Sequence, residues 1–249
     1  MAPTDVSILL MAGVIVFAGH VVKGATGFGS ALFAVPLLLL ILDIRFVAPL
    51  FMLFDIIGGF IMVGSSWRSV DQRLLLLVLA GMLLGTGIGT WVLLTVSHQI
   101  LKRVLGILVT SWAVARLLQG ESGGGPKRGR LGNSLAPASG FVGGLLGAMF
   151  SVSGPPIIIY LSHVLHDKGA FRATLFGIFF VEACYKLVFF SAGQLINRQV
   201  LLFALLLAPF VLAGVIAGSR LQRRVDQRLF KRVVAAILAA AGLLLIFSP

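Results

Sequence analysis

Long apolar runs separated by short polar breaks dominate the chain. Residues 74–96, for example, contain no charged side chain. A helix of about 20 apolar residues crosses the hydrocarbon core of a bilayer. A membrane β-barrel would instead alternate polar and apolar residues at every second position. The pattern therefore predicts an all-α protein, a polytopic membrane helix bundle.

Ten apolar segments can be delimited. They cover residues 6–22, 30–42, 46–63, 74–96, 100–118, 135–150, 155–165, 171–190, 200–218 and 229–247. The second, sixth and seventh are too short to span a bilayer at 1.5 Å per residue. We expect these three to be half-helices, tilted helices or re-entrant pieces, and an arrangement of eight spans is the alternative.

Composition and charge agree with a membrane protein. The chain is 59% apolar and 11% charged, whereas soluble domains carry about 25% charged residues. The net charge of +12 comes from basic residues dispersed between the apolar runs, which favours anionic lipid head groups over nucleic acid as partners. Residues 1–5 lack Lys and Arg, so we expect the first apolar run to remain in the mature protein.

The distribution of basic residues predicts the topology. With ten crossings and Lys186 inside the membrane, one side collects fifteen Lys and Arg residues, and the other only Arg45, Lys102, Arg103 and Arg198. Cytoplasmic loops carry the excess of basic residues. We therefore expect a multi-pass protein of the cell inner membrane with both termini in the periplasm.

Two halves of the chain show internal similarity. Residues 119–134 are rich in glycine and basic residues, and indicate a cytoplasmic linker between an N-terminal repeat, 1–118, and a C-terminal repeat, 135–249. At an offset of 129, residues 96–104 resemble 225–233, and Gly85 and Gly89 match Gly214 and Gly218. At an offset of 120, Gly24, Gly27 and Pro36 match Gly144, Gly147 and Pro156. Chance similarity between apolar segments is the alternative.

Five segments in each half is an odd number, so homologous halves would have opposite orientations in the membrane. The charges agree, because Lys102 lies on the side poor in basic residues and Lys231 on the rich side. The sequence thus predicts two inverted five-segment repeats with broken helices. Inverted repeats commonly enclose a substrate site near the middle of the bilayer.

Glycine-rich stretches at residues 23–30 and 140–156 are candidates for this site. Glycine and proline interrupt helices, and the free N–H groups of a helix N-terminus attract anions. Hydroxyl groups that add further donors are Thr26, Ser30, Ser151 and Ser153. The alternative is that the glycines form only a tight packing seam.

These two stretches, with Ser153-Gly154-Pro155-Pro156 and the later Phe171-Arg172-Ala173-Thr174, resemble the sulfite exporter TauE/SafE family. The resemblance implies export or permeation of small anions such as sulfite, sulfoacetate or related organosulfonates across the cytoplasmic membrane. The expected substrate contacts in the glycine-rich stretches then include Lys23, Gly24, Gly27 and Gly154.

Charged residues inside apolar segments are costly and often functional. Glu182 and Lys186 lie four residues apart, so they share a helix face and can form an ion pair. Asp55 lies in the middle of an earlier segment. We expect Lys186 to bind the anion and Asp55 and Glu182 to couple transport to protons; a purely structural ion pair is the alternative.

Arg172 is a further candidate anion ligand, because a guanidinium group matches sulfonate or carboxylate oxygens. For Arg172 and Lys23, which stand at segment ends, contact with lipid head groups is the alternative. No nucleotide-binding motif, metal-ligand set or nucleophile motif is present, so we expect a transporter that is not an enzyme and has no cofactor or metal. A passive anion channel, a permease for short carboxylates and a membrane-embedded enzyme are the alternatives. Residues 81–89 offer a face of small residues for a homodimer, and contacts within one chain are the alternative use of that face.

The inverted repeat makes a direct prediction about sidedness. Single cysteines introduced at Lys102 and Lys231 in a Cys184→Ser background should react with a membrane-impermeant thiol reagent from opposite sides of the membrane. Labelling in intact cells and in inverted vesicles measures this. Reaction of both cysteines from the same side would rule out the inverted arrangement.

Overall fold

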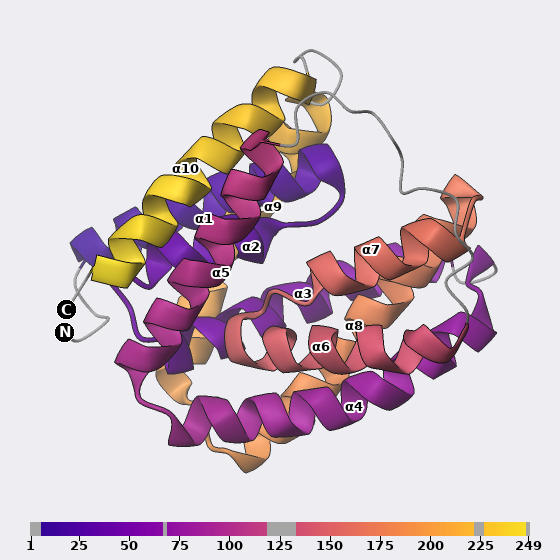
Figure 1. The fold of residues 1–249 in the computed structure, drawn as a ribbon. Coiled ribbons are helices and arrows are strands. Elements are labelled where there is room, and N and C mark those ends of the chain that lie inside the picture. Colours follow the sequence, from indigo (N-terminus) through magenta and orange to yellow (C-terminus); the bar gives the residue numbers. More distant parts are fainter. Residues whose placement is uncertain (1–5, 67–68, 119–132, 222–226, 248–249) are drawn as a thin grey trace. The chain divides into compact units, whose positions relative to one another are not determined.

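A computed structural model describes residues 6–66, 69–118, 133–221 and 227–247, and this part of the chain is helical without strands (Figure 1). Its α-helices are α1 (Val6–Thr26), α2 (Ser30–Leu38), α3 (Ile44–Ser66), α4 (Gln72–Thr95), α5 (His98–Leu118), α6 (Ala136–Phe150), α7 (Gly154–Val164), α8 (Lys168–Ala192), α9 (Arg198–Leu221) and α10 (Gln227–Phe247). Each falls on one of the ten apolar segments. The predicted all-α class is confirmed.

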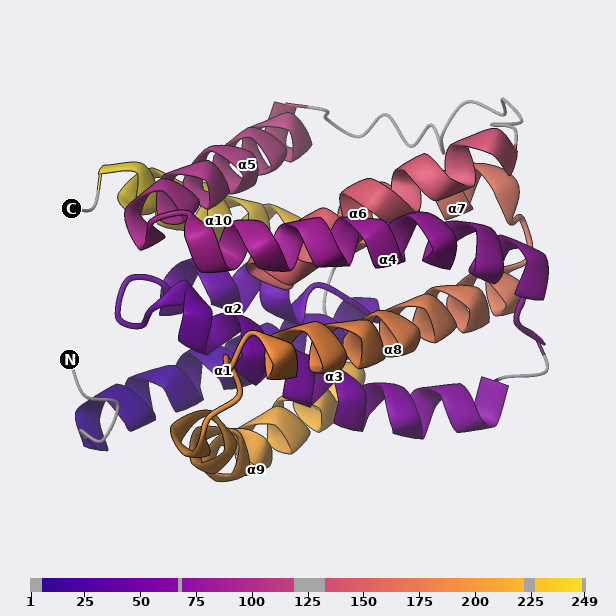
Figure 2. The ribbon, with the colours of Figure 1, turned by 90° about the horizontal axis from the view of Figure 1, so that it is seen from below.

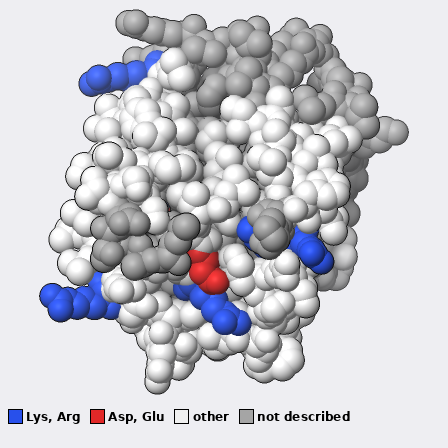
Figure 3. Space-filling view, turned by 90° about the vertical axis from the view of Figure 1, so that its left-hand side faces the viewer, with Lys and Arg blue, Asp and Glu red and all other residues white. Residues whose placement is uncertain are grey.

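Four helices within the described residues are long and apolar enough to cross a membrane. They are α1, α4, α9 and the stretch Gly169–Ala192 of α8. Their outward faces carry large apolar side chains such as Leu205 of α9, which is 71% exposed. Most of the described atoms on the face drawn in Figure 3 likewise belong to uncharged residues. A lipid environment accounts for these apolar surfaces, and the prediction of a polytopic membrane protein is confirmed.

The three short segments take part in two broken helix pairs, α1 with α2 and α6 with α7. The helix α2 has nine residues, α6 has fifteen and α7 has eleven. Between α1 and α2, Gly27 and Gly29 have φ angles of 88° and 89°. Between α6 and α7, Ser151 has a φ of 56° and ends α6 in the left-handed conformation. Left-handed residues interrupt the helical hydrogen bonds, so each pair bends where the sequence predicts a break.

The chain forms two compact units. Unit one contains Met1–Leu50, Val96–Ser122 and Asn197–Pro249, and unit two contains Phe51–Thr95 and Gly123–Ile196. In unit one α1 packs along α9 and α5 along α10, while in unit two α4 packs along α6 and α8 (Figures 1 and 2). Each unit therefore takes helices from both predicted halves of the sequence.

Glycines allow close helix contact in both units. In unit one, a Cβ on Gly214 would lie 2.6 Å from Phe17 O, and one on Gly218 would overlap Val21 O. In unit two, a Cβ on Gly89 would lie 2.6 Å from Leu145 O. The side chain of any larger residue would push these helices apart, because the obstacle is backbone.

The glycine contacts recur with a constant spacing. Gly85 approaches Phe141 as Gly214 approaches Phe17, and Gly89 approaches Leu145 as Gly218 approaches Val21. The corresponding glycines of α4 and α9 are 129 residues apart in the sequence, which is the offset of the sequence match. Between α1 and α6 it is 124 residues, one helical turn more than the sequence match of 120. The two breaks agree with 124, since Gly27 N donates to Lys23 O at 2.7 Å and Ser151 N to Gly147 O at 2.8 Å.

The packing of α4 predicts which of its glycines tolerate a methyl group. Gly85→Ala should lower the melting temperature, because its Cβ would overlap the backbone of Phe141, although alanine favours helices by about 1 kcal/mol. Gly87→Ala is the matched control, because its Cβ would meet only the Phe189 ring at 3.3 Å. Thermal unfolding of the purified protein in detergent measures both. Equal melting temperatures for the two variants would contradict the close helix contact.

Candidate functional site

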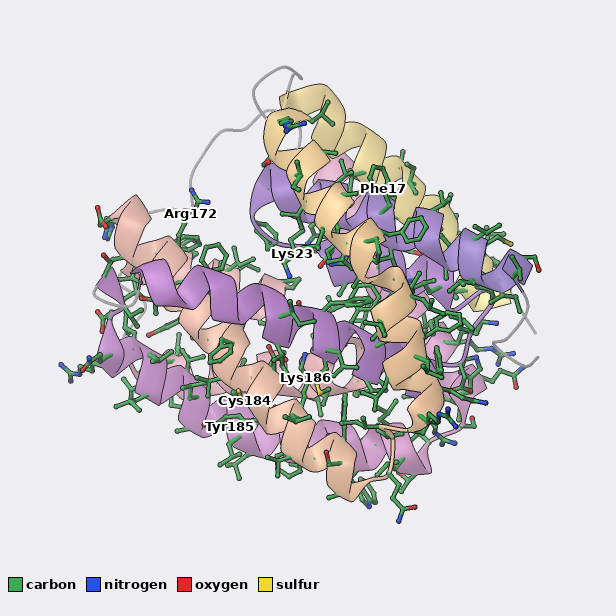
Figure 4. The ribbon with its side chains drawn as sticks, turned by 180° about the vertical axis from the view of Figure 1, so that it is seen from behind. Phe17, Lys23, Arg172, Cys184, Tyr185 and Lys186 are labelled. Atoms are coloured by element: carbon green, nitrogen blue, oxygen red, sulfur yellow. The ribbon has the colours of Figure 1, made fainter. Side chains whose placement is uncertain are left out.

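A buried cluster of charges lies in unit two. Lys186 of α8 is 1% exposed, and its Nζ lies 3.4 Å from Glu182 Oε1 and 4.0 Å from Asp55 Oδ2 (Figure 4 labels Lys186). Glu182 is on the same helix, whereas Asp55 comes from α3. We call these three residues the Lys186 cluster. The predicted pairing of Glu182 with Lys186 is present, and Asp55 joins it.

The break between α6 and α7 packs against this cluster. A Cβ on Gly147 would overlap Glu182 Oε1 and would lie 3.0 Å from the Ser153 Cβ. The Ser153 side chain also lies beside the Glu182 carboxylate. The absence of a side chain at Gly147 thus leaves the space that the carboxylate fills, and the broken helix holds Glu182 in place.

The cluster has one cation and two acids. If all three groups are ionised, its net charge is −1. Coulomb attraction at 3.4–4.0 Å is strong away from water, but burial of each charge costs several kcal/mol. A cluster with an unequal number of charges can take up a proton, or the lysine can exchange one acid for another anion. Among the described residues, no group of three His, Cys, Asp or Glu side chains could hold a metal ion.

Three predicted contacts lie at the break in unit two. Ser151 and Ser153 are 6% and 7% exposed, and Gly154 is the first residue of α7. A Cβ on Gly154 would meet the Ile158 side chain at 3.5 Å, so a methyl group fits there. Ser153 therefore lies at the Lys186 cluster, and Gly154 is the next residue along the chain.

The predicted substrate contacts in the first glycine-rich stretch, residues 23–30, lie in unit one, around the break between α1 and α2. Thr26 Oγ1 lies 2.8 Å from Val22 O and 2.6 Å from Phe28 O, so its hydroxyl donates to the backbone. Ser30 is buried at the start of α2, and Gly27 has a left-handed backbone that favours glycine. Gly24 packs on α9, where its Cβ would overlap Val215 O. Lys23 lies in the last turn of α1.

Arg172 does not join the Lys186 cluster. It is exposed near the start of α8, fourteen residues before Lys186, which corresponds to about 21 Å along the helix axis. Figure 4 shows the two labelled side chains well apart along α8. Arg172 and Lys186 therefore cannot hold the same small anion.

Sequence reasoning missed a second contact in unit two. Thr174 is fully buried, and its Oγ1 accepts a hydrogen bond of 2.9 Å from Asp71 N. Asp71 Oδ1 in turn accepts from Leu74 N at 3.0 Å and caps the start of α4. Thr174 thus ties α8 to α4. The signal was available, because an Asp before an apolar run is typical of a helix N-cap.

Comparison with known proteins agrees with this structure. The family model for the sulfite exporter TauE/SafE matches residues 11–245. The chain is 30% identical over 195 residues to the probable inner membrane transporter protein TsaS of Comamonas testosteroni. The aligned region covers 78% of this chain and 80% of the relative. It is 24% identical over 230 residues to the probable sulfite/organosulfonate exporter TauE of Cupriavidus necator, covering 90% of this chain and 88% of the relative. No solved structure matches.

The match with the family model extends over almost the whole chain, and the apolar helices suit a protein that crosses the membrane several times. This chain belongs to the sulfite exporter TauE/SafE family of membrane transporters.

Proposed function

We propose that this protein is a secondary transporter that moves small anions, such as sulfite, sulfoacetate or related organosulfonates, out of the cell across the inner membrane. The names of the two relatives support the substrate class and the membrane. The observation that carries the proposal is the buried ammonium group of Lys186 beside a broken helix. Such a group attracts sulfonate or sulfite oxygens through charge-assisted hydrogen bonds.

The anion contacts that we propose around Lys186 come from the break in unit two. Ser151 and Ser153 supply hydroxyl groups. The first turn of α7, which starts at Gly154, supplies unpaired backbone N–H groups, although its two prolines have no N–H to donate. In unit one we propose Lys23, Gly24, Thr26, Gly27 and Ser30 as further contacts. Arg172 would form a separate contact near the start of α8.

We also propose that Asp55 and Glu182 couple transport to protons. A proton that binds Asp55 or Glu182 would offset the negative charge of an anion that binds Lys186. The groups that face one another here are Lys186, Glu182, Asp55 and the Ser153 hydroxyl. A proton that travels with a monovalent anion makes transport electroneutral, whereas an anion alone is driven outward by about 2.3 kcal/mol for each 100 mV of inside-negative potential.

The inverted repeat would supply the mechanism of alternating access. Its support is the recurrence of glycine contacts and breaks in the two units, with spacings of 124 and 129 residues. With ten crossings, the loop before α3 and the turn before α5 lie on one side of the membrane, and Arg45 Nη2 indeed donates to Val96 O at 3.0 Å. We propose that both termini face the periplasm. A homodimer would need a surface other than Gly81, Gly85 and Gly89, because these glycines contact α6 within unit two.

A passive anion channel and a permease for short carboxylates are the second candidates, since Lys186 would also attract ions in a channel or a carboxylate. Substrate counterflow separates carrier from channel: a carrier exchanges labelled for unlabelled anion, and a channel gives unitary currents instead. Competition by acetate and malonate against labelled sulfite measures the preference between the two anion classes.

Flux in liposomes tests the role of Lys186. Lys186→Gln should reduce saturable ³⁵S-sulfite counterflow at least roughly 10-fold, because loss of a charge-assisted bond costs about 1.5–3 kcal/mol. Arg103→Gln, at an exposed position of α5, is the control and should keep wild-type flux. Undiminished flux in Lys186→Gln would exclude this lysine as the anion ligand, and the absence of saturable flux in the wild type would refute the transport proposal itself.

The contact between Gly147 and Glu182 can be tested by a pair of substitutions. Gly147→Ala should reduce flux and lower the melting temperature, because the added Cβ overlaps the buried Glu182 carboxylate and forces it to move. In the double variant Gly147→Ala with Glu182→Asp, the shorter side chain withdraws from the new methyl group, and part of the flux should return. If the double variant is less active than Gly147→Ala alone, Glu182 does not act through this contact.

A further inference from the structure

Thr174 lies near the start of α8, the helix that carries Glu182 and Lys186. It is fully buried, whereas Arg172 in the same Phe-Arg-Ala-Thr element is exposed. Its Oγ1 accepts a hydrogen bond of 2.9 Å from the backbone N–H of Asp71, the residue immediately before α4. This sequence element therefore makes a contact between α8 and α4 that does not involve its guanidinium group.

Asp71 is itself held by α4 and, through α4, by α6. Its Oδ1 accepts from Leu74 N at 3.0 Å and caps the helix. Further along α4, Cβ atoms on Gly81 and Gly85 would overlap backbone oxygens of α6. The two helices are thus in direct backbone contact, which side-chain rearrangement cannot relieve. Asp71 therefore gives Thr174 a partner whose position is fixed relative to α6.

The contacts return to α8 at the break after α6, where Gly147 leaves the space that the Glu182 carboxylate fills. The helix α8 is thus attached to the pair α4 and α6 at two residues, Thr174 and Glu182, which are about 12 Å apart along its axis. Two attachment points on one rigid helix determine its position along that axis. Lys186 lies one turn beyond Glu182, so the same two points place its ammonium group.

The place of this ammonium group decides what it can bind, because charge-assisted hydrogen bonds require donor–acceptor distances of about 2.7–2.9 Å. A helix that slides by one residue moves its side chains by about 1.5 Å, which is enough to break such a bond. We propose that Thr174 is a positioning residue for anion binding: its bond to Asp71 fixes α8 along its axis and thereby holds Lys186 beside the break between α6 and α7. The inference rests on the proposed function, because it assumes that the anion binds at Lys186.

Counterflow of ³⁵S-sulfite in liposomes tests this role. Thr174→Val keeps the shape of the side chain but removes the acceptor of the Asp71 N–H, so it should raise the KM roughly 3-fold to 30-fold, as for changes that act on a site through packed elements. Thr174→Ser keeps the acceptor and should retain most of the affinity. Thr90→Val is the matched control, because it removes a buried hydroxyl that donates to Thr86 O within α4 at 2.8 Å. It should leave the KM unchanged.

A second measurement follows the position of α8 without transport. Cys184 is the only cysteine in the sequence; it is partly exposed and lies two residues before Lys186 (Figure 4). Thr174→Val should change its rate of alkylation by N-ethylmaleimide in nanodiscs roughly 2-fold or more, because this rate depends on the exposure and surroundings of the thiol. Thr174→Ser and Thr90→Val should not change it. If Thr174→Val does not fold, Thr174→Ala replaces it in both measurements.

An unchanged KM for Thr174→Val, or an equal rise in Thr174→Ser or Thr90→Val, would overturn the inference, because the bond to Asp71 would then not set the affinity for the anion. Unchanged alkylation of Cys184 would also overturn it, since α8 would keep its position without the bond. Absence of saturable flux in the wild type would refute the proposed function, whereas the alkylation rates would still decide whether Thr174 positions α8.

Discussion

Burial of the Lys186 ammonium group is the constraint on which unit two depends. An ammonium group away from water is tolerated only when anionic partners lie close to it. Here the partners come from two helices, because Glu182 lies one turn away on α8 and Asp55 belongs to α3. Glu182 in turn fills the space left by the missing side chain of Gly147. A single buried charge therefore links α3, α8 and the break between α6 and α7, and a change at any of the three alters its surroundings.

The second physical requirement is close contact between helix backbones. Lipid tails are as apolar as leucine, so helices in a membrane gain little from hydrophobic burial and associate through close packing of small residues. Gly214 and Gly218 allow this contact between α9 and α1, and Gly85 and Gly89 allow it between α4 and α6. The recurrence of one arrangement in both units is what duplication followed by exchange of helices would leave. These glycine contacts also hold α1 and α6, the first helix of each broken pair, against their neighbours.

The apolar segments and their breaks were predictable because they depend on local properties, namely the length of an apolar run and the presence of glycine or proline. The ion pair of Glu182 with Lys186 was predictable for the same reason, since four residues make one helical turn. The contact of Asp55 with Lys186 and the packing of Glu182 against Gly147 could not be predicted, because both depend on how the helices pack. The offset of 120 was one turn short for a related reason: small residues recur every four positions, so glycine matches alone leave the register uncertain by a turn. Arg172 joined the predicted site through the family resemblance, and its distance along α8 separates it from Lys186.

The number of acids in the cluster bears on whether it is structural or functional. A structural ion pair needs one carboxylate, and Glu182 supplies it at short range in a buried position. Asp55 adds little stability to a lysine that is already paired, and its longer distance and partial exposure agree with a weak contribution. It does, however, bring a second carboxylate to the ammonium group from another helix. A carboxylate beyond the one that pairs with Lys186 can take up a proton without leaving the lysine unpaired. For that reason Asp55, rather than the better-buried pair, is the residue that we propose for proton coupling.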